Sequence, residues 1–303
     1  MPPASVTVRA PATSANLGPG FDCLGLALDL WATATVTVEK GRGALPEDPA
    51  SQTALAAARR VYKRLGRKSP PLTVAYESDI PPARGLGASA AARAAGLLAA
   101  NALLGEPLDR EDLLALGAEL EGHADNMAPC LFGGFQIVVS EEEAGDVRAS
   151  KERRWLHLGL PLPELKAVLF IPHFAMPTDE SRRLLPRSIP RRDAVHNIGR
   201  AALLVGALAG GRLELLATAT QDRLHQPARA ELFPAMYDIF EAAKEAGGHA
   251  AYLSGGGSTV AALATGHEER IARLMQQAAV ARGYSGRSAI TEPSTEGARV
   301  MES

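Results

Sequence analysis

The sequence predicts an α+β protein built from two domains that meet near residue 160. The chain has 303 residues, which is long enough for two separate hydrophobic cores. Segments with strand alternation and segments with helical periodicity follow one another in both halves. After residue 166 their order is strand, helices, strand, strand, helix, strand, as in a split βαβ unit of the ferredoxin-like kind. We therefore expect a first domain at 1–160 and a second at 161–303.

The composition favours a globular protein without a polyanionic partner. Hydrophobic residues make up 46% of the chain and the net charge is −2, so nothing in the charge balance indicates nucleic acid or an anionic membrane. The two cysteines, Cys23 and Cys130, are too few for a disulfide framework and lack the spacing of a metal site. Neither a signal peptide nor an apolar run of about 20 residues is visible. We expect a soluble, cytoplasmic protein.

The first half begins with a strand in which Val6, Val8 and Ala10 alternate with polar residues. Residues 11–25 mix glycine, proline and small polar residues, so we expect a loop rich in hydrogen-bonding groups. The next predicted elements are a strand at 31–39, a turn-rich connection at 41–51, a helix at 52–65 and a strand at 72–76.

The segment PPARGLGASAAA, residues 81–92, is the centre of the sequence pattern. Gly85 and Gly87 permit positive φ angles and let a ligand approach the backbone, and residues 89–104 have the pattern of a helix. The N-terminus of a helix presents unpaired N–H groups and a partial positive charge, which together suit a phosphate. An ordinary turn capped by Ser89 is the alternative. No lysine follows the last glycine, so this is not a Walker A loop.

Further elements complete the first half. The helix is expected to end at Gly105, and Asp109 is expected to cap another that runs towards Glu121. An irregular polar loop at 122–134, a strand at 135–139 and a solvated acidic hairpin or loop at 140–151 are expected to follow.

The second half has its own glycine turn, SGGGST at residues 254–259. By itself this turn predicts either a tight hairpin or a ligand-binding loop. The strands around it are expected at 249–253 and 259–264. The other predicted elements are strands at 167–171 and 288–291 and helices at 193–208, 212–224, 234–246 and 268–282.

Three separated motifs resemble those of the GHMP kinase superfamily. They are PATSANLGPGFD at 11–22, RGLGASAA at 84–91 and SGGGST at 254–259. The first motif, HADNMAP at 123–129 and DRLHQPAR at 222–229 are similar to those of the homoserine kinase family within it.

The resemblance implies a domain like one in ribosomal protein S5 followed by a ferredoxin-like domain. It implies transfer of the γ-phosphoryl group of ATP to the side-chain hydroxyl of L-homoserine, with Mg²⁺, as a step of threonine biosynthesis. It also implies a homodimer.

The resemblance further implies which residues bind nucleotide and metal. The nucleotide would be bound by the backbone of two segments: Pro81, Pro82, Ala83, Arg84, Gly85, Leu86, Gly87, Ala88, Ser89, Ala90 and Ala91, together with Gly255, Gly256, Gly257 and Ser258. Mg²⁺ would be held by Glu121, or by its competitor Glu119, with Ser89.

The acceptor residues follow from the same resemblance. Asn16, Asp22 and Asn126 would bind the ammonium and hydroxyl end of the substrate. Arg182 and Arg229 would bind its carboxylate, for which a guanidinium fork is well suited. The resemblance implies catalytic roles for Asn126, Arg182 and Thr178.

One departure from the family loop and one residue of a matching motif affect the chemistry. Ala88 stands where the family loop usually has a serine, so one hydroxyl for metal or phosphate is missing. Asn126 stands where several relatives have an aspartate as general base. A loose phosphoryl-transfer transition state depends on alignment and electrostatics more than on a base. We therefore expect catalysis without a side-chain base.

Three other interpretations stay open from the sequence alone. One is a superfamily kinase that acts on a mevalonate-like compound or a sugar. Another is a catalytically silent ligand sensor, which only Ala88 favours. The third, an RNA-binding module, rests on the S5-like fold and has no basic surface to support it.

Overall fold

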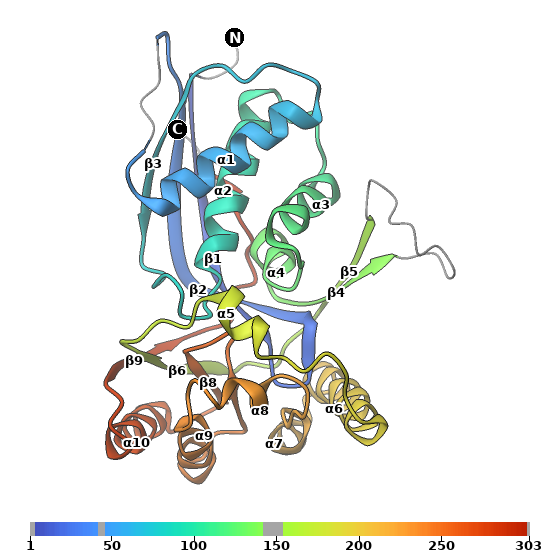
Figure 1. Cartoon of the computed structure of the whole chain (residues 1–303), viewed down its shortest axis with the longest axis vertical. Coiled ribbons are helices and arrows are strands. Elements are labelled where there is room, and N and C mark those ends of the chain that lie inside the picture. Colours follow the sequence, from blue (N-terminus) through green and yellow to red (C-terminus); the bar gives the residue numbers. More distant parts are fainter. Residues whose placement is uncertain (1–3, 42–45, 142–153, 302–303) are drawn as a thin grey trace.

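Two antiparallel sheets form the framework of the protein (Figure 1). The computed structural model describes residues 4–41, 46–141 and 154–301, so most of the predicted acidic loop at 140–151 lies outside the described residues. Six strands form the first sheet, in the order β10-β1-β2-β4-β5 with β3 paired to β2, and four form the second, in the order β7-β8-β6-β9. With helices packed on both sheets, the predicted α+β class is confirmed.

The elements of the first half match most of the predicted ones. They are β1 (Ser5–Asn16), β2 (Gly20–Val38), α1 (Pro49–Arg64), β3 (Leu72–Ser78), α2 (Ala88–Leu103), α3 (Arg110–Glu121), α4 (Met127–Phe132), β4 (Phe135–Glu141) and β5 (Arg154–Leu160).

The expected loop at 11–25 is wrong, because β1 and β2 continue through it as an antiparallel pair down to Asn16 and Gly20. Register shifts at Pro11 and next to Asn16 accommodate the irregular sequence. The polar residues of this segment suggested an exposed loop, but Thr13 and Ser14 are fully buried and hydrogen-bond to other parts of the chain. The loop expected at 122–134 likewise contains the short helix α4.

Helix α2 is the buried centre of the first half. It packs against the β1–β2 pair on one side and against α1 on the other (Figure 1). Its small side chains permit this close packing: a Cβ added at Gly96 would lie 2.1 Å from the backbone oxygen of Ala54 on α1. The alanine-rich composition therefore reflects the space between sheet and helix.

The second half has the ferredoxin-like strand order. In chain order its strands are β6, β7, β8 and β9, and their spatial order places the first beside the fourth. The elements are β6 (Lys166–Pro172), α5 (Thr178–Arg183), α6 (Arg191–Ala209), a 3₁₀ turn (Leu213–Leu215), α7 (Leu216–Ala219), α8 (Gln226–Arg229), α9 (Met236–Glu245), β7 (Ala250–Leu253), β8 (Val260–Ala264), α10 (Glu268–Ala281), β9 (Gly286–Thr291) and β10 (Arg299–Val300).

The single helix expected at 212–224 is wrong. The chain forms a 3₁₀ turn and the short α7, and it then becomes irregular, because the Asp222 carboxylate accepts hydrogen bonds from the N–H groups of Leu224, His225 and Gln226. These bonds stabilise the turn before α8. Helices α5 and α8 were not predicted.

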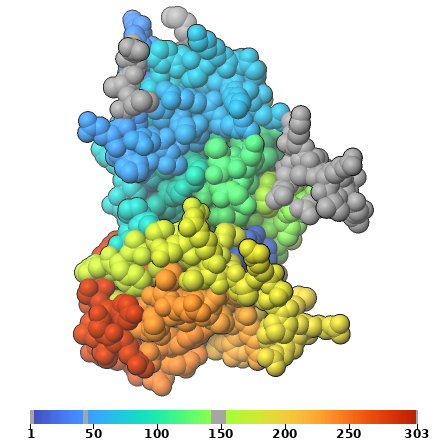
Figure 2. Space-filling model, viewed as in Figure 1, coloured from blue at the N-terminus to red at the C-terminus, as the bar shows by residue number. Residues whose placement is uncertain are grey.

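The two halves are joined at more than one place. Strand β10, at the end of the chain, pairs with β1 of the first sheet. In Figure 2 the yellow segment that carries α5 lies across the junction between the upper and lower halves. The division at residue 160 falls at the end of β5 and stays a prediction.

We predict that Gly96→Ala destabilises the protein although alanine is the better helix former. The added methyl would meet the Ala54 carbonyl at 2.1 Å, so we expect a loss of about 1–3 kcal/mol in the free energy of unfolding, measured by urea denaturation. Gly206→Ala on α6 is the control, because no heavy atom lies within 4 Å of the added Cβ and a gain of about 0.5–1 kcal/mol is expected. Equal effects of the two substitutions would contradict the packing argument.

Candidate functional site

A cavity of about 290 Å³ lies between the two halves, where the two glycine turns meet. Its lining includes all the side chains with predicted substrate or catalytic roles: Asn16, Asp22, Asn126, Thr178, Arg182 and Arg229. Residues 83–90, Gly255 and Gly256 of the predicted nucleotide segments also line it. The others do not: Pro81, Pro82, Ala91, Gly257 and Ser258. A larger cavity of about 760 Å³ holds none of the motif residues; it is lined by residues 132–136, 159–166, 264, 265, 268 and 292–295.

The loop before α2 has the backbone shape that requires glycine. Gly85 and Gly87 have φ angles of +73° and +69°, and Gly87 is the residue that precedes the helix. A Cβ at Gly87 would lie 1.9 Å from Oγ1 of Thr13, so the loop sits directly on β1. The first helical bond runs from Ala91 N to Gly87 O at 2.9 Å, which leaves the preceding N–H groups of α2 directed at the cavity.

The second glycine turn supports this loop from the other half. Ser254 Oγ donates to Gly85 O at 2.7 Å, and Thr259 N donates to Arg84 O at 3.1 Å. Arg84 itself is used structurally, because its Nε donates to the carbonyl oxygen of Pro172 at 2.8 Å. The second half thus holds the loop through its carbonyl oxygens and the Arg84 side chain, and no bond from the N–H groups of residues 85–87 is found among the described residues.

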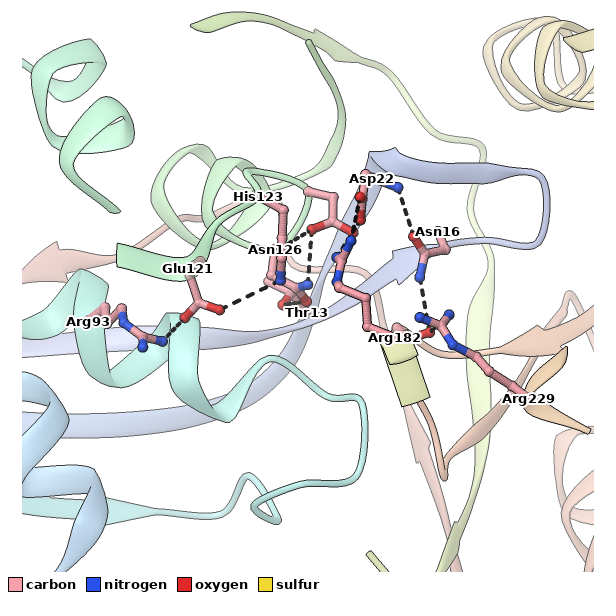
Figure 3. Close-up of polar contacts among 11 residues, drawn as sticks. Thr13, Asn16, Asp22, Arg93, Glu121, His123, Asn126, Arg182 and Arg229 are labelled. Atoms are coloured by element: carbon pink, nitrogen blue, oxygen red, sulfur yellow. Dashed lines mark hydrogen bonds and ion pairs between the residues drawn. The ribbon is translucent and has the colours of Figure 1, made fainter. Parts of the chain in front are cut away.

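At the other end of the cavity, Arg182 and Asp22 form a bidentate ion pair. Arg182 on α5 donates to both carboxylate oxygens of Asp22, each at 2.7 Å (Figure 3). These bonds raise the pKa of Arg182 although burial opposes the shift. Asp22 is oriented in turn by Asn16, whose Oδ1 accepts from the Asp22 N–H at 3.0 Å.

Arg229 is the most unusual charged residue of the site, because it is only 1% exposed. Its Nη1 donates to Gly255 O at 3.0 Å and to Nδ1 of His225 at 2.7 Å, while its Nε has no partner among the described residues. Burial lowers the pKa of Arg229 to about 10, and the nearby charge of Arg182 adds to this. A buried guanidinium with an unused donor, lining a cavity, is suited to an anionic ligand.

His225 is neutral in this arrangement, with its proton on Nε2. Nε2 donates to Gly18 O at 2.7 Å, and Nδ1 accepts from Arg229. Burial lowers the pKa of His225 to about 4, and the charge of Asp222 only partly offsets this effect. The ring therefore connects the β1–β2 turn to the buried arginine.

A network of polar side chains fixes Asn126 at the centre of the cavity. Thr13 Oγ1 donates to Asn126 Oδ1 at 2.8 Å, and Asn126 Nδ2 donates to Asp125 at 3.2 Å. Asp125 also contacts His123 Nδ1 at 2.6 Å. Burial disfavours the charged imidazole, but the hydrogen bond and charge of Asp125 and the charge of Glu121 outweigh this and raise the pKa of His123. Thr13 and Asp125 were not predicted as site residues, although both lie inside the quoted motifs.

Glu121 and Glu119, the two candidate metal ligands, differ in their surroundings. Glu121 lines the cavity and forms an ion pair with Arg93 (Figure 3). Glu119 does not line it and pairs with Arg60 at 2.5 Å on the outer surface. Ser89 lies near Glu121, since Arg93 contacts both side chains.

The donor set fits a hard cation that is bound mainly through phosphate. The described residues contain no cluster of three or more histidine, cysteine or acidic side chains arranged for a metal. Mg²⁺ commonly takes only one or two protein oxygens and completes its shell with phosphate and water. The carboxylate of Glu121 and the hydroxyl of Ser89, both in the lining of one cavity, are ligands of this type.

Comparison with known proteins agrees with this geometry. Residues 52–134 match the model of the GHMP kinases N terminal domain, and residues 204–281 match that of the GHMP kinases C terminal domain. Fold and site together define the class of the GHMP kinases.

Relatives with known names narrow the class. A homoserine kinase of Deinococcus radiodurans is 44% identical over 87% of this chain and 85% of its own length. One of Desulfitobacterium hafniense is 38% identical over 98% of this chain and 100% of its own. The crystal structure of homoserine kinase from Cytophaga hutchinsonii superposes with a TM-score of 0.84 at 30% identity, covering 99% and 98% of the two chains. The chain belongs to the homoserine kinase family.

We predict that the neutral state of His225 makes the protein less stable in acid. In the unfolded chain the pKa of His225 is 6.5, whereas in the folded chain it is about 4. The unfolded state therefore binds the proton first, and the free energy of unfolding decreases as the pH drops from 6.5 towards 4. The expected slope is about 1.4 kcal/mol per pH unit.

His225→Gln is the matched variant, because its amide can donate to Gly18 O and accept from Arg229 without titrating. Urea denaturation at intervals from pH 7.5 to 5 should show a smaller acid loss in the variant than in the wild type. Parallel curves for the two proteins would contradict a neutral His225.

Proposed function

We propose that the protein transfers the γ-phosphoryl group of ATP to the side-chain hydroxyl of L-homoserine and forms O-phospho-L-homoserine, a step of threonine biosynthesis. The observation that carries this proposal is that the two ends of the cavity suit different chemical groups. One end presents the N–H groups of the α2 N-terminus, which suit phosphate, and the other contains buried Arg229 with an unused N–H. The names of the relatives support the same reaction.

The second end of the cavity complements an amino acid. Homoserine carries an ammonium and a carboxylate, and the Asp22–Arg182 pair offers the opposite charges side by side at 2.7 Å. The ammonium can bind Asp22 while the carboxylate binds the guanidinium groups of Arg182 and Arg229, both of which line the cavity. Mevalonate has no ammonium and galactose has neither charge, so neither would compensate Asp22.

The hydroxyl of the substrate would then face Asn126, which Thr13 and Asp125 hold in place. Thr178, at the start of α5, lines the same cavity. We propose that Asn126, Arg182 and Thr178 align the hydroxyl with the phosphoryl group, and that its proton leaves to phosphate or solvent late in the reaction. Alignment and electrostatic stabilisation supply the rate in this scheme.

Nucleotide binding would rest on residues 83–90 and on Gly255 and Gly256. Glu121 and Ser89 would hold Mg²⁺, which supplies charge neutralisation of the transferred phosphoryl group when bound. In place of the hydroxyl missing at Ala88, the N–H groups of the first turn of α2 would bind phosphate oxygens.

We also propose that the protein works in the cytoplasm as a homodimer. Among the described residues no helix combines the length and apolar character needed to cross a membrane. Sedimentation velocity would test the dimer, and a single species at the monomer mass of 31.8 kDa would contradict it.

A substrate panel tests the proposed reaction. We expect ATP-dependent phosphorylation of homoserine, detected by a coupled ADP assay and by mass spectrometry of the product, and none above background for mevalonate or galactose. Arg229→Met should raise KM for homoserine by about 100-fold or more, because a buried charged hydrogen bond contributes about 3 kcal/mol, with KM for ATP nearly unchanged. A thermal melt of the variant controls for unfolding. No turnover of homoserine by the wild type would refute the proposal and favour a ligand sensor.

Asn126→Asp tests catalysis without a side-chain base. Since the substrate hydroxyl needs alignment more than deprotonation, we expect kcat at neutral pH to fall or stay within about threefold of wild type. The pH profile from 6 to 9 should gain no steep new acid limb. A strong rise in kcat would show that a base at this position is useful.

A further inference from the structure

Arg93 lies on α2 next to the end of the cavity that suits phosphate, and it belongs to none of the sequence motifs. It follows Ser89 by four residues, and its side chain is 23% exposed. Its Nη1 contacts Glu121 Oε1 (Figure 3), and the same nitrogen contacts Ser89 Oγ. Arg93 does not line the cavity, so it acts on a ligand through these two side chains.

The carboxylate of Glu121 needs such a partner. Its side chain is only 10% exposed, and a buried negative charge without a partner is unfavourable. The other nearby basic group, His123 Nε2, is 4.0 Å from Glu121 and already bound to Asp125 through Nδ1. Arg93 is therefore the group that compensates Glu121 when no metal ion does so.

We propose that Arg93 is a positioning residue that replaces the metal ion as counter-charge of Glu121 and lets the phosphate loop hold a nucleotide in the absence of Mg²⁺. Without Arg93, Glu121 would stand as an uncompensated negative charge beside the phosphates and repel a metal-free nucleotide. With Mg²⁺ present, the ion itself compensates Glu121. The inference deepens the proposed function and rests on nucleotide binding at this loop.

A second consequence concerns the metal. Arg93 and Mg²⁺ compete for the same carboxylate, so the guanidinium weakens the hold of Glu121 on the ion. Arg93 thus sets how strongly nucleotide binding depends on Mg²⁺, although it contacts neither the nucleotide nor the metal ion. Ser89, the other proposed metal ligand, also contacts Arg93.

The test is titration calorimetry of ADP with the full-length protein, once with EDTA and once with excess Mg²⁺. Arg93→Met keeps a long helix-forming side chain and removes the charge. We expect this substitution to weaken the affinity for metal-free ADP by about tenfold and to change the affinity for Mg²⁺–ADP by less than about threefold. The Mg²⁺ concentration at half-saturation should fall, and Arg93→Lys should restore most of the metal-free affinity.

Two further variants separate charge compensation from a structural effect. The double variant R93M/E121Q removes the uncompensated carboxylate, so its metal-free ADP affinity should return to within about threefold of wild type. Arg60→Met removes a similar arginine–glutamate pair, with Glu119, away from the cavity, and should leave both affinities unchanged.

Three results would overturn the inference. Equal weakening of both ADP complexes in Arg93→Met, or failure of the double variant to recover, would assign Arg93 a structural role. No weakening of either complex would show that Arg93 has no role in nucleotide binding. In these cases the wild type still binds ADP and the proposed function stands. If the wild type binds no ADP under either condition, the proposed function fails and the inference fails with it.

Discussion

The close contact between the two glycine turns is the constraint on which the site depends. A Cβ at Gly85 would lie 2.1 Å from the backbone oxygen of Ser254, so the two halves meet here almost backbone to backbone. The same contact fixes the loop that begins α2, because Ser254 and Thr259 donate to its carbonyl oxygens. With those carbonyls occupied by protein, the N–H groups on the opposite side of the loop remain for phosphate.

Two acidic side chains of the site are paired with arginines before any ligand arrives. Asp22 is paired with Arg182 and Glu121 with Arg93, and Arg229 is bonded to neutral His225. Such pairing reduces the cost of burying charge in a cavity between two sheets. In the proposed function, the substrate ammonium would take the place of Arg182 beside Asp22, and the metal ion would take the place of Arg93 beside Glu121.

Some features of the site cost stability, and they lie where a ligand would bind. The unused Nε of Arg229 is a buried donor without a partner among the described residues. Asn16 and Asp22, neither of them glycine, adopt positive φ angles of 69° and 59°. Unsatisfied donors and strained backbone of this kind concentrate at functional sites, where the ligand compensates for them.

Residue patterns were enough to predict the α+β class, the ferredoxin-like order after residue 166 and the glycine loop before α2, because alternation, helical periodicity and the positions of glycines are local signals. The other features depend on contacts between distant segments. Residues 11–16 became a strand because Thr13 and Ser14 find partners more than 100 positions away in the chain. The helical period already places Glu119 and Glu121 on different faces of α3, but only the packing of α2 against α3 brings Glu121 to Arg93 and to the cavity. Contacts between distant segments leave no periodic trace in a single sequence, since either partner alone looks like an ordinary polar residue.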